Sequence, residues 1–352
     1  MAETDEDDKT VIPVRGSSWV SPPAATPDPA EAEGHNALPV GGHVAEFEIK
    51  SIIGIGGFGI VYLAHDQSLG RNVALKEYLP TSLAFRNGLN VSVRTARHAD
   101  TFAAGLASFI NEARILAQFD NPSLVKVYRF WNANGTAYMV MPYYEGPTLK
   151  QALQEASEPP TEQWLRGLLV PLLSALQLLH SENYFHRDIA PDNILLVRGK
   201  RPILLDFGAA RRVIAGSNKA LTVILKPGFA PIEQYSDTDD MTQGAWTDIY
   251  ALAAVVHYAI MGKAPVPSVS RLLKDTAVPL AQAASGRYSD RFLRAIDRAL
   301  SVRPEDRPQT IDDFRESLGL HDDVVSDLPR AGEERGKRKW SRKAMAVGGV
   351  LA

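Results

Sequence analysis

The sequence predicts an α+β fold in which a small β-rich part precedes a larger, mostly helical part. Between residues 43 and 141, short runs rich in β-branched and aromatic residues are separated by turns that contain glycine or asparagine, a pattern typical of strands. After residue 142, leucine and alanine recur at the spacing of helices. Two parts of such different character leave a cleft between them, and we expect the functional residues there.

The composition excludes several classes of function. The chain has 352 residues, of which 45% are hydrophobic, and this suffices for one large core or two smaller ones. It contains no cysteine, which excludes disulfide frameworks, cysteine-ligated zinc, iron–sulfur clusters and thiol catalysis. The net charge of −3 gives no general attraction to nucleic acid, and no nucleic-acid motif is present. The eight histidines show no metal-ligand spacing.

Both ends of the chain differ from its middle. Residues 1–42 are rich in proline, serine and acidic residues, so we expect a disordered tail there and no signal peptide. Residues 319–343 are expected to form a flexible basic tail. The apolar residues 344–352 are too few to span a bilayer, which takes about 20, but they resemble the start of a transmembrane helix behind a cytoplasmic flank. We expect a cytoplasmic protein, tethered to the inner face of the cell membrane if the chain continues beyond Ala352.

The β-rich part is expected to hold five strands and one helix. Apolar residues at spacings of three and four predict a helix over Phe102–Leu116. An Asn134-Gly135 turn is typical of a tight hairpin. The predicted strands are 47–53, 59–64, 71–76, 124–131 and 137–141.

The helical part contains two segments with clear signals. Seven of the eight leucines in residues 161–180 recur at helical spacing, and Pro171 within this segment predicts a kink. Residues 248–261 are apolar nearly all round, which predicts a buried helix, and Gly262 is expected to end it.

Three glycines near the start of the β-rich part fit the pattern G-x-G-x-x-G: Gly54, Gly56 and Gly59. Glycines are also ordinary turn residues, so the pattern alone is weak. A dinucleotide-binding loop would open a helix, whereas residues 60–64 continue as a strand, and no Gly-Lys-Ser/Thr follows. A glycine-rich hairpin between two strands can lay its backbone over the phosphates of a nucleotide.

The next predicted strand ends on Lys76. Most lysines lie on the surface, and a functional lysine at this place needs a carboxylate partner. Glu112 is the candidate, because the helical period puts it beside the apolar face that contains Phe109 and Leu116. We therefore expect Glu112 to point toward Lys76 rather than into water.

Two motifs in the helical part complete an ordered set. Residues His186–Asn193 read His-Arg-Asp-Ile-Ala-Pro-Asp-Asn, and Leu204–Gly208 reads Leu-Leu-Asp-Phe-Gly. Together with the glycine hairpin, Lys76 and Glu112, they resemble the motif set of the eukaryotic-type protein kinases over residues 44–318. Three further segments resemble bacterial Ser/Thr protein kinases: Lys76–Pro80, Asp206–Arg211 and Pro227–Tyr235.

The resemblance implies a bilobal protein-kinase-like fold, with a β-rich N-lobe with one helix over residues 43–141 and a mostly helical C-lobe over 142–318. It implies a Ser/Thr protein kinase that transfers the γ-phosphate of ATP to protein hydroxyl groups. By this resemblance Lys76 pairs with the α- and β-phosphates and is held by Glu112, and Asp188 accepts the proton of the substrate hydroxyl. Asp206 binds an Mg²⁺ that bridges the phosphates and Asn193 binds a second Mg²⁺, with Mn²⁺ as the alternative metal.

The resemblance also implies an adenine pocket and two supporting contacts. Pro142 lacks an N–H, but the family uses only the carbonyl there and the N–H of the residue at Tyr144. Asp248 resembles the aspartate that holds the His-Arg-Asp turn, and Glu233 and Arg307 resemble a buried ion pair of the C-lobe. The residues expected around the adenine are Val61, Ala74, Met141, Pro142, Tyr144 and Leu195.

The sequence departs from the family at two positions that concern activity. Ala190 stands where a lysine is usual, and Lys226 stands where a threonine is usual. One hypothesis is that the Lys226 ammonium fills the space beside Ala190 and stabilises the transferring phosphoryl group. The alternative is that Lys226 points to solvent and activity is low. The usual Ala-Pro-Glu is also altered, to Pro231-Ile-Glu233.

Phosphorylation is expected at several hydroxyl groups. Arg187 beside Asp188 suggests control by a phosphate on the activation segment, with Thr222 as the first candidate and Ser217 as the second. The acidic tail offers further autophosphorylation sites, which would also dock a phosphothreonine-binding partner: Thr10, Ser17 and Ser18.

Three other functions compete with this interpretation. A pseudokinase acting as a nucleotide-binding signalling scaffold is kept open by Ala190, although the charged motif residues are intact. A small-molecule kinase is disfavoured by the complete substrate-side segment that ends in Glu233. A kinase specific for tyrosine is poorly supported, because the activation segment lacks a tyrosine between Asp206 and Glu233.

Overall fold

The computed structural model describes residues 36–199, 201–206, 225–235 and 242–320. The predicted tails lie almost entirely outside these ranges, as do Phe207 and Gly208 of the Asp-Phe-Gly motif. The five predicted phosphorylation sites also lie outside them: Thr10, Ser17, Ser18, Ser217 and Thr222.

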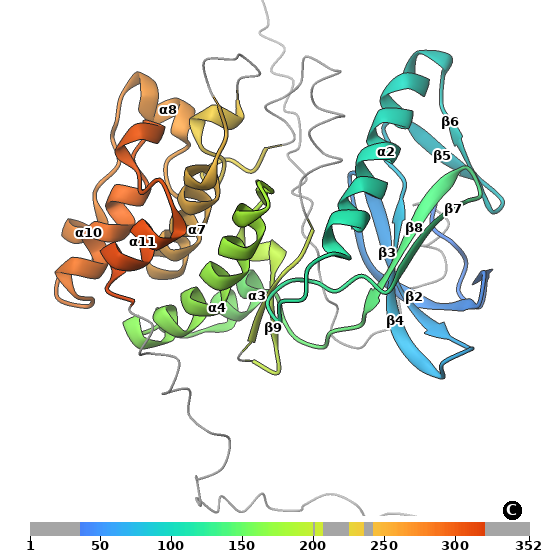
Figure 1. The fold of residues 1–352 in the computed structure, drawn as a ribbon, viewed down its shortest axis with the longest axis horizontal. Helices are drawn as coiled ribbons and strands as arrows, with labels where there is room; N and C mark the ends of the chain where they lie inside the picture. The colour runs from blue at the N-terminus through green and yellow to red at the C-terminus, as the bar shows by residue number, and fades with distance from the viewer. Residues whose placement is uncertain (1–35, 200, 207–224, 236–241, 321–352) are drawn as a thin grey trace, which may run out of the picture. The chain divides into compact units, whose positions relative to one another are not determined.

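The N-lobe is built on a six-stranded antiparallel sheet whose strand order is β1-β2-β3-β4-β8-β7 (Figure 1). Its two central strands, β3 and β4, have few exposed residues because both faces are covered. Asn134 and Gly135 form the predicted tight turn, both with positive φ. The strands are β1 (His43–Val44), β2 (Phe47–Gly56), β3 (Gly59–Asp66), β4 (Arg71–Tyr78), β7 (Arg129–Ala133) and β8 (Thr136–Pro142).

Two features of the sheet differ from the prediction. The strand predicted over 124–131 pairs with β8 only from Arg129, because Leu124 makes an isolated parallel bridge to Leu204 instead. A hairpin that the sequence pattern did not predict, β5 (Ala84–Asn87) with β6 (Asn90–Val93), is inserted after β4.

The predicted helix of the N-lobe is α2 (Ala99–Leu116), and it lies along the sheet (Figure 1). Its buried positions include Phe102, Phe109 and Glu112. Tyr78 at the end of β4 packs its ring against Phe102 and Phe109 and donates a hydrogen bond to the carbonyl of Phe102. The helix is therefore fixed to the strand that contains Lys76.

Ordered contacts begin before residue 43, where the N-lobe was expected to start. Leu38 is buried in the N-lobe core, and its backbone N–H donates to the hydroxyl of Tyr62 at 3.0 Å. Tyr62 in turn donates to Glu77, whose carboxylate also pairs with Arg86 of β5. Leu38 is thus part of the core although the sequence around it shows no helical or strand periodicity.

The C-lobe packs its helices around α7, which is buried nearly all round as predicted. Gly262 ends α7 in the left-handed conformation, with φ 69°. In α4, Thr161 caps the first turn and the helix continues through Pro171. The helices are α3 (Leu149–Glu155), α4 (Glu162–Ser181), α7 (Ala245–Met261), α8 (Ser268–Leu273), α9 (Leu280–Ala283), α10 (Asp290–Ala299) and α11 (Ile311–Leu318).

The two lobes have separate apolar cores. A small hairpin of β9 (Ile194–Val197) and β10 (Arg201–Leu204) lies where they meet, and Ile203 of β10 belongs to the N-lobe core whereas Leu204 belongs to the C-lobe core. No helix in the described ranges is both long enough and apolar enough to cross a membrane.

Candidate functional site

The three predicted glycines lie on the β2–β3 hairpin. Gly56 pairs with Gly59 at its closed end, and Gly54 pairs with Val61. A Cβ atom on Gly59 would lie 2.1 Å from the carbonyl oxygen of Glu77, so only glycine allows β3 to approach β4 this closely. The predicted hairpin is confirmed, and Gly59 has a packing role within it.

A cavity of about 540 Å³ lies beside this hairpin. Its volume is in the usual range for small-molecule sites. All six residues predicted to surround an adenine line it: Val61, Ala74, Met141, Pro142, Tyr144 and Leu195. The three glycines are not among its lining residues, whereas Asp206 is.

The cavity also has a part that the motifs did not reveal. Gly146 lies in the segment that joins the lobes, and a Cβ atom there would lie 2.2 Å from the carbonyl oxygen of Leu196. The segment therefore needs glycine to run against β9. Glu145, Gln151 and Glu155 add polar groups to the lining. A glycine that closely follows a buried strand was the one sequence signal for this contact.

Lys76 pairs with two carboxylates from different parts of the chain. Its Nζ lies 3.2 Å from Glu112 Oε1, as predicted, and 2.6 Å from Asp206 Oδ1. Burial alone would lower the pKa of Lys76, but the charges of Asp206 and Glu112 outweigh it and raise that pKa. Burial raises the pKa of Glu112 to about 7 against the opposing charge of Lys76, and the charge of Asp206 adds to the rise. One ammonium group thus serves two mutually repelling carboxylates.

The turn before Asp188 is held by Asp248 of α7, as the sequence predicted. The Asp248 carboxylate accepts hydrogen bonds from the backbone N–H groups of His186 and Arg187 at 2.8 and 2.7 Å. Arg187 has a φ of 64°, a strained conformation for a residue other than glycine. Burial would raise the pKa of Asp248, but a hydrogen bond and the charge of His180 outweigh it and lower that pKa. The anion therefore stays available to hold the strained turn.

The side-chain amide of Asn193 holds Asp188 through its nitrogen and leaves its oxygen without a hydrogen bond within the described ranges. Its Nδ2 donates to Asp188 Oδ2 at 2.6 Å and to the Asp188 carbonyl at 2.8 Å. Its Oδ1 is buried and has no hydrogen-bond partner among the described residues. An amide oxygen and the Asp206 carboxylate are hard oxygen ligands of the kind that Mg²⁺ prefers.

These two residues do not make a metal site by themselves. No group of three or more His, Cys, Asp or Glu side chains within the described ranges could hold a metal ion. A Mg²⁺ ion commonly takes one or two protein ligands and completes its shell with water and substrate phosphates. The oxygens of Asn193 and Asp206 fit a metal of that kind.

The side chain of Lys226 comes from another segment and reaches the loop that contains Asp188 and Asp192. Its Nζ is 2.8 Å from Asp192 Oδ1 and 3.7 Å from Asp188 Oδ2, and its side chain is 17% exposed. The alternative in which Lys226 points away into solvent therefore does not describe this structure. Ala190, which lies between these two aspartates in the sequence, is buried.

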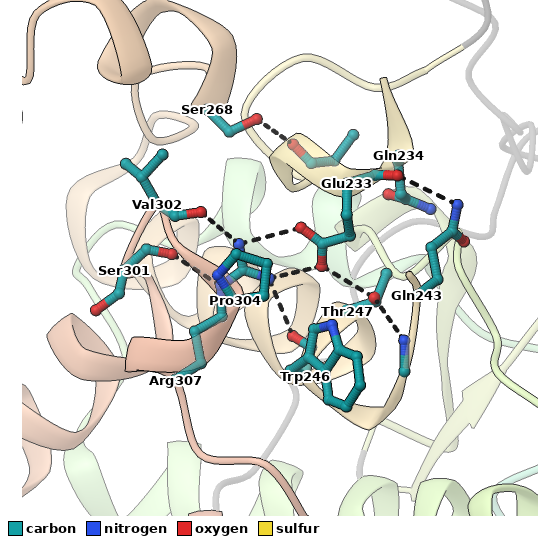
Figure 2. Close-up of polar contacts among 12 residues, drawn as sticks. Glu233, Gln234, Gln243, Trp246, Thr247, Ser268, Ser301, Val302, Pro304 and Arg307 are labelled. Atoms are coloured by element: carbon teal, nitrogen blue, oxygen red, sulfur yellow. Dashed lines mark hydrogen bonds and ion pairs between the residues drawn. The ribbon is translucent and has the colours of Figure 1, made fainter. Parts of the chain in front are cut away.

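The predicted ion pair between Glu233 and Arg307 anchors the segment that contains Lys226 (Figure 2). Both side chains are fully buried, and Arg307 Nη1 lies 2.7 Å from Glu233 Oε1. Arg307 also donates to the backbone carbonyls of Ser301 and Val302, and Thr247 donates to Glu233 (Figure 2). The charges are thus paired on all sides, which a buried ion pair requires.

Comparisons with known proteins agree with this geometry. Residues 47–317 match the family described as the protein kinase domain. The chain is 28% identical over 298 residues to the serine/threonine-protein kinase PknA of Nostoc sp., covering 80% of this chain and 48% of that protein. It is 29% identical over 297 residues to the serine/threonine-protein kinase pkn2 of Myxococcus xanthus, covering 80% and 33%. The chain thus spans less than half the length of these curated relatives.

Solved structures show the same fold. A structure described as the apo form of PpkA-294 shares 51% sequence identity, with a TM-score of 0.75, over 80% of this chain and 99% of that one. The crystal structure of the PknI kinase domain of Mycobacterium tuberculosis matches at 21% identity and a TM-score of 0.57, over 80% of this chain and 100% of that one.

Proposed function

This chain belongs to the protein kinase family, and from that premise we propose that it is a Ser/Thr protein kinase, which transfers the γ-phosphoryl group of ATP to protein hydroxyl groups. The observation that carries the proposal is the double pairing of Lys76 with Glu112 and Asp206, at the edge of a cavity lined by Asp206. It brings together a cation for phosphate oxygens and a carboxylate for a metal.

The residues divide the work of phosphoryl transfer. Lys76, oriented by Glu112, binds the α- and β-phosphates of ATP. Asp188, oriented by Asn193, accepts the proton of the attacking hydroxyl. The hydroxyl oxygen bonds to the γ-phosphorus as the bond to the β–γ bridging oxygen breaks, and that oxygen leaves on ADP with the electron pair. The protein forms no covalent bond to the phosphoryl group in this step, so the rate depends mainly on how the reactants are positioned and on how charge is stabilised in the transition state.

Asn193 Oδ1 and Asp206 would hold the divalent metal that this family uses with ATP. Bound there, the metal would neutralise charge on the phosphates. We propose Mg²⁺ as this metal, because the two oxygens suit a hard cation that keeps its other positions for water and phosphate, with Mn²⁺ as the alternative. Phosphorylation assays with each ion, and with neither, test the choice.

The test of the function is phosphorylation by the purified chain with labelled ATP and Mg²⁺. Lys76→Met removes the phosphate-binding cation, and Asp188→Asn removes the proton acceptor. We expect label in the wild type, and losses of roughly 10²- to 10⁴-fold in both variants. Phosphoamino acid analysis should give phosphoserine or phosphothreonine. No label in the wild type, with ATP still bound, would support a nucleotide-binding scaffold instead.

We also propose that the activation segment is autophosphorylated, at Thr222 or Ser217. Support comes from Arg187, whose Nε is buried without a hydrogen-bond partner among the described residues. Burial lowers the pKa of this guanidinium, which a phosphate nearby would counteract. Mass spectrometry of active protein should find phosphate there, and Thr222→Ala with Ser217→Ala should reduce transfer.

The two tails carry proposals that rest on sequence alone. Phosphate at Thr10, Ser17 or Ser18 would recruit a phosphothreonine-binding partner. The basic residues 337–343 and the apolar residues 344–352 would hold a cytoplasmic chain at the inner face of a membrane. Sedimentation with vesicles that contain anionic lipid, compared with neutral vesicles and with a chain ending at residue 336, tests the second proposal.

A further inference from the structure

We propose that Lys226 supplies the ammonium group that stabilises the transferring phosphoryl, from the segment before Glu233 rather than from the loop of Asp188. The inference rests on the proposed kinase function. Lys226 Nζ lies 3.7 Å from Asp188 Oδ2 and 2.8 Å from Asp192 Oδ1. Asp188 receives the hydroxyl proton, so a cation this close to it lies beside the place where the phosphoryl group passes.

The position of Ala190 makes room for this lysine. Asp188 and Asp192 are two residues to either side of Ala190, and Lys226 bridges their carboxylates, so its ammonium group lies at the loop that contains position 190. Ala190 is 1% exposed and its backbone is extended, with φ −158° and ψ 162°. A long side chain at 190 would compete with Lys226 for this space. We therefore infer that the alanine at position 190 and the lysine at position 226 are a matched pair, in which the small residue leaves space for the long one.

The backbone of Lys226 is fixed by a tight turn. Its carbonyl accepts a hydrogen bond from the N–H of Phe229 at 3.1 Å, with Pro227 and Gly228 between them. Gly228 has φ 85°, which with a preceding proline is the arrangement of a type II turn. A Cβ atom on Gly228 would lie 2.7 Å from the carbonyl oxygen of Pro265, so the turn is seated against the C-lobe.

Two further contacts hold the segment beyond the turn. Ser268 donates to the carbonyl of Ala230 at 2.9 Å, and Glu233 is buried against Arg307 (Figure 2). A lysine on a base this rigid loses little of its position when the ion pair with Asp192 exchanges for phosphate oxygens. Pre-positioned charge of this kind stabilises a transition state with little reorganisation. Asp192 is then a positioning residue for the ammonium group.

The first measurement is the transfer rate at saturating ATP and Mg²⁺, with nucleotide affinity measured separately. Lys226→Ala should slow transfer by about 10²- to 10³-fold and change the Kd of ATP far less. Asp192→Asn should slow it by only about two- to five-fold, because the ammonium group stays. A double variant, Ala190→Lys with Lys226→Thr, places a lysine in the loop of Asp188 instead. Its transfer rate should be roughly ten-fold or more above that of Lys226→Thr alone.

The second measurement does not need turnover. ADP with Mg²⁺ and aluminium fluoride imitates the transferring phosphoryl group, and wild type should bind ADP more tightly when the fluoride is present. Lys226→Ala should lose most of this gain while binding ADP alone as wild type does. Thermal unfolding of each variant identifies any that fails to fold.

Two results would overturn the proposal. One is a Lys226→Ala variant that transfers phosphate at the wild-type rate and keeps the gain from aluminium fluoride. The other is a slow Lys226→Ala variant whose loss is matched by an equal loss of ADP affinity. Neither of these two results contradicts the kinase function, provided that the wild type is active. An inactive wild type contradicts the kinase function itself, and the ADP measurement still reports on Lys226.

Discussion

The Glu233–Arg307 cluster and the Lys76 site are both buried groups of charge, but they differ in how completely their polar atoms are paired. Arg307 meets both oxygens of Glu233 and several backbone carbonyls. At the Lys76 site one ammonium group serves two carboxylates, and nearby Asn193 Oδ1 has no partner among the described residues. The closed cluster leaves neither buried charge without a partner, whereas the open one keeps its capacity for a ligand.

The largest effect expected from this contrast is on stability. Arg307→Met leaves the Glu233 carboxylate buried without its cation, which should lower the free energy of unfolding by about 3–5 kcal/mol. Arg294→Met is the matched control, because Arg294 is 74% exposed in its pair with Asp290 and should change stability by less than about 0.5 kcal/mol. Urea unfolding measures both. Equal losses in the two variants would remove the distinction between closed and exposed pairs.

The open site should behave in the opposite way. Asp206→Asn should reduce phosphoryl transfer by about 10²- to 10³-fold. The same variant should unfold at an unchanged or higher urea concentration, because Glu112 then shares Lys76 with no second carboxylate. A drop in stability as large as that of Arg307→Met would show that the Lys76 site holds the fold together as the Glu233 cluster does.

A second buried cluster lies on the other face of β4, where Tyr62 links Leu38 to Oε2 of Glu77, while Glu77 Oε1 has no hydrogen-bond partner among the described residues. Tyr62→Phe removes one hydroxyl from this chain of hydrogen bonds and should cost about 2 kcal/mol of stability. The transfer rate should stay within about two-fold, since only packing on the far face of the strand changes. A large loss of activity without loss of stability would show that this cluster contributes to catalysis rather than to packing.

The smallest expected effect concerns pH. Burial raises the pKa of Glu112 to about 7, above its value in an unfolded chain. The folded state therefore holds a proton that the unfolded state has lost, so this group stabilises the fold at low pH and the effect is lost as the pH rises through 7. Between pH 6 and 7 the loss is about 1 kcal/mol. Urea unfolding with chelator present should show this slope in wild type, and Glu112→Gln should remove it.

Some of this site follows directly from local sequence patterns. Lys76 lies on a strand and Glu112 beside the apolar stripe of a helix, so the periodicities give the face of each element, and the resemblance to the kinase motifs predicts that the two side chains pair. The turn at Asn134 and Gly135 and the end of α7 at Gly262 follow from the preference of these residues for positive φ. Each of these features depends on a few neighbouring residues.

Other features depend on partners far away in the chain. Leu38 stands in a short segment without a periodic pattern, and its burial depends on a sheet whose strands come later in the chain. The β5–β6 hairpin has strands of only four residues each, too short to show a clear alternation of apolar and polar residues. The sequence shows that position 190 lacks a lysine, but only the packing of Gly228 and Glu233 decides that Lys226 reaches Asp192, 34 residues away.

The β5–β6 hairpin has a mechanical consequence for α2. The N–H of Val91 in this hairpin donates to the carbonyl of Asn134 at 2.8 Å, and a Cβ atom on Gly135 would lie 2.4 Å from the carbonyl oxygen of Val91. The hairpin is thereby clamped to the β7–β8 turn, and the chain enters α2 shortly after leaving it (Figure 1). The entrance of α2 is thus fixed to the sheet through this hairpin and its middle through Tyr78, which favours a constant separation between Glu112 and Lys76.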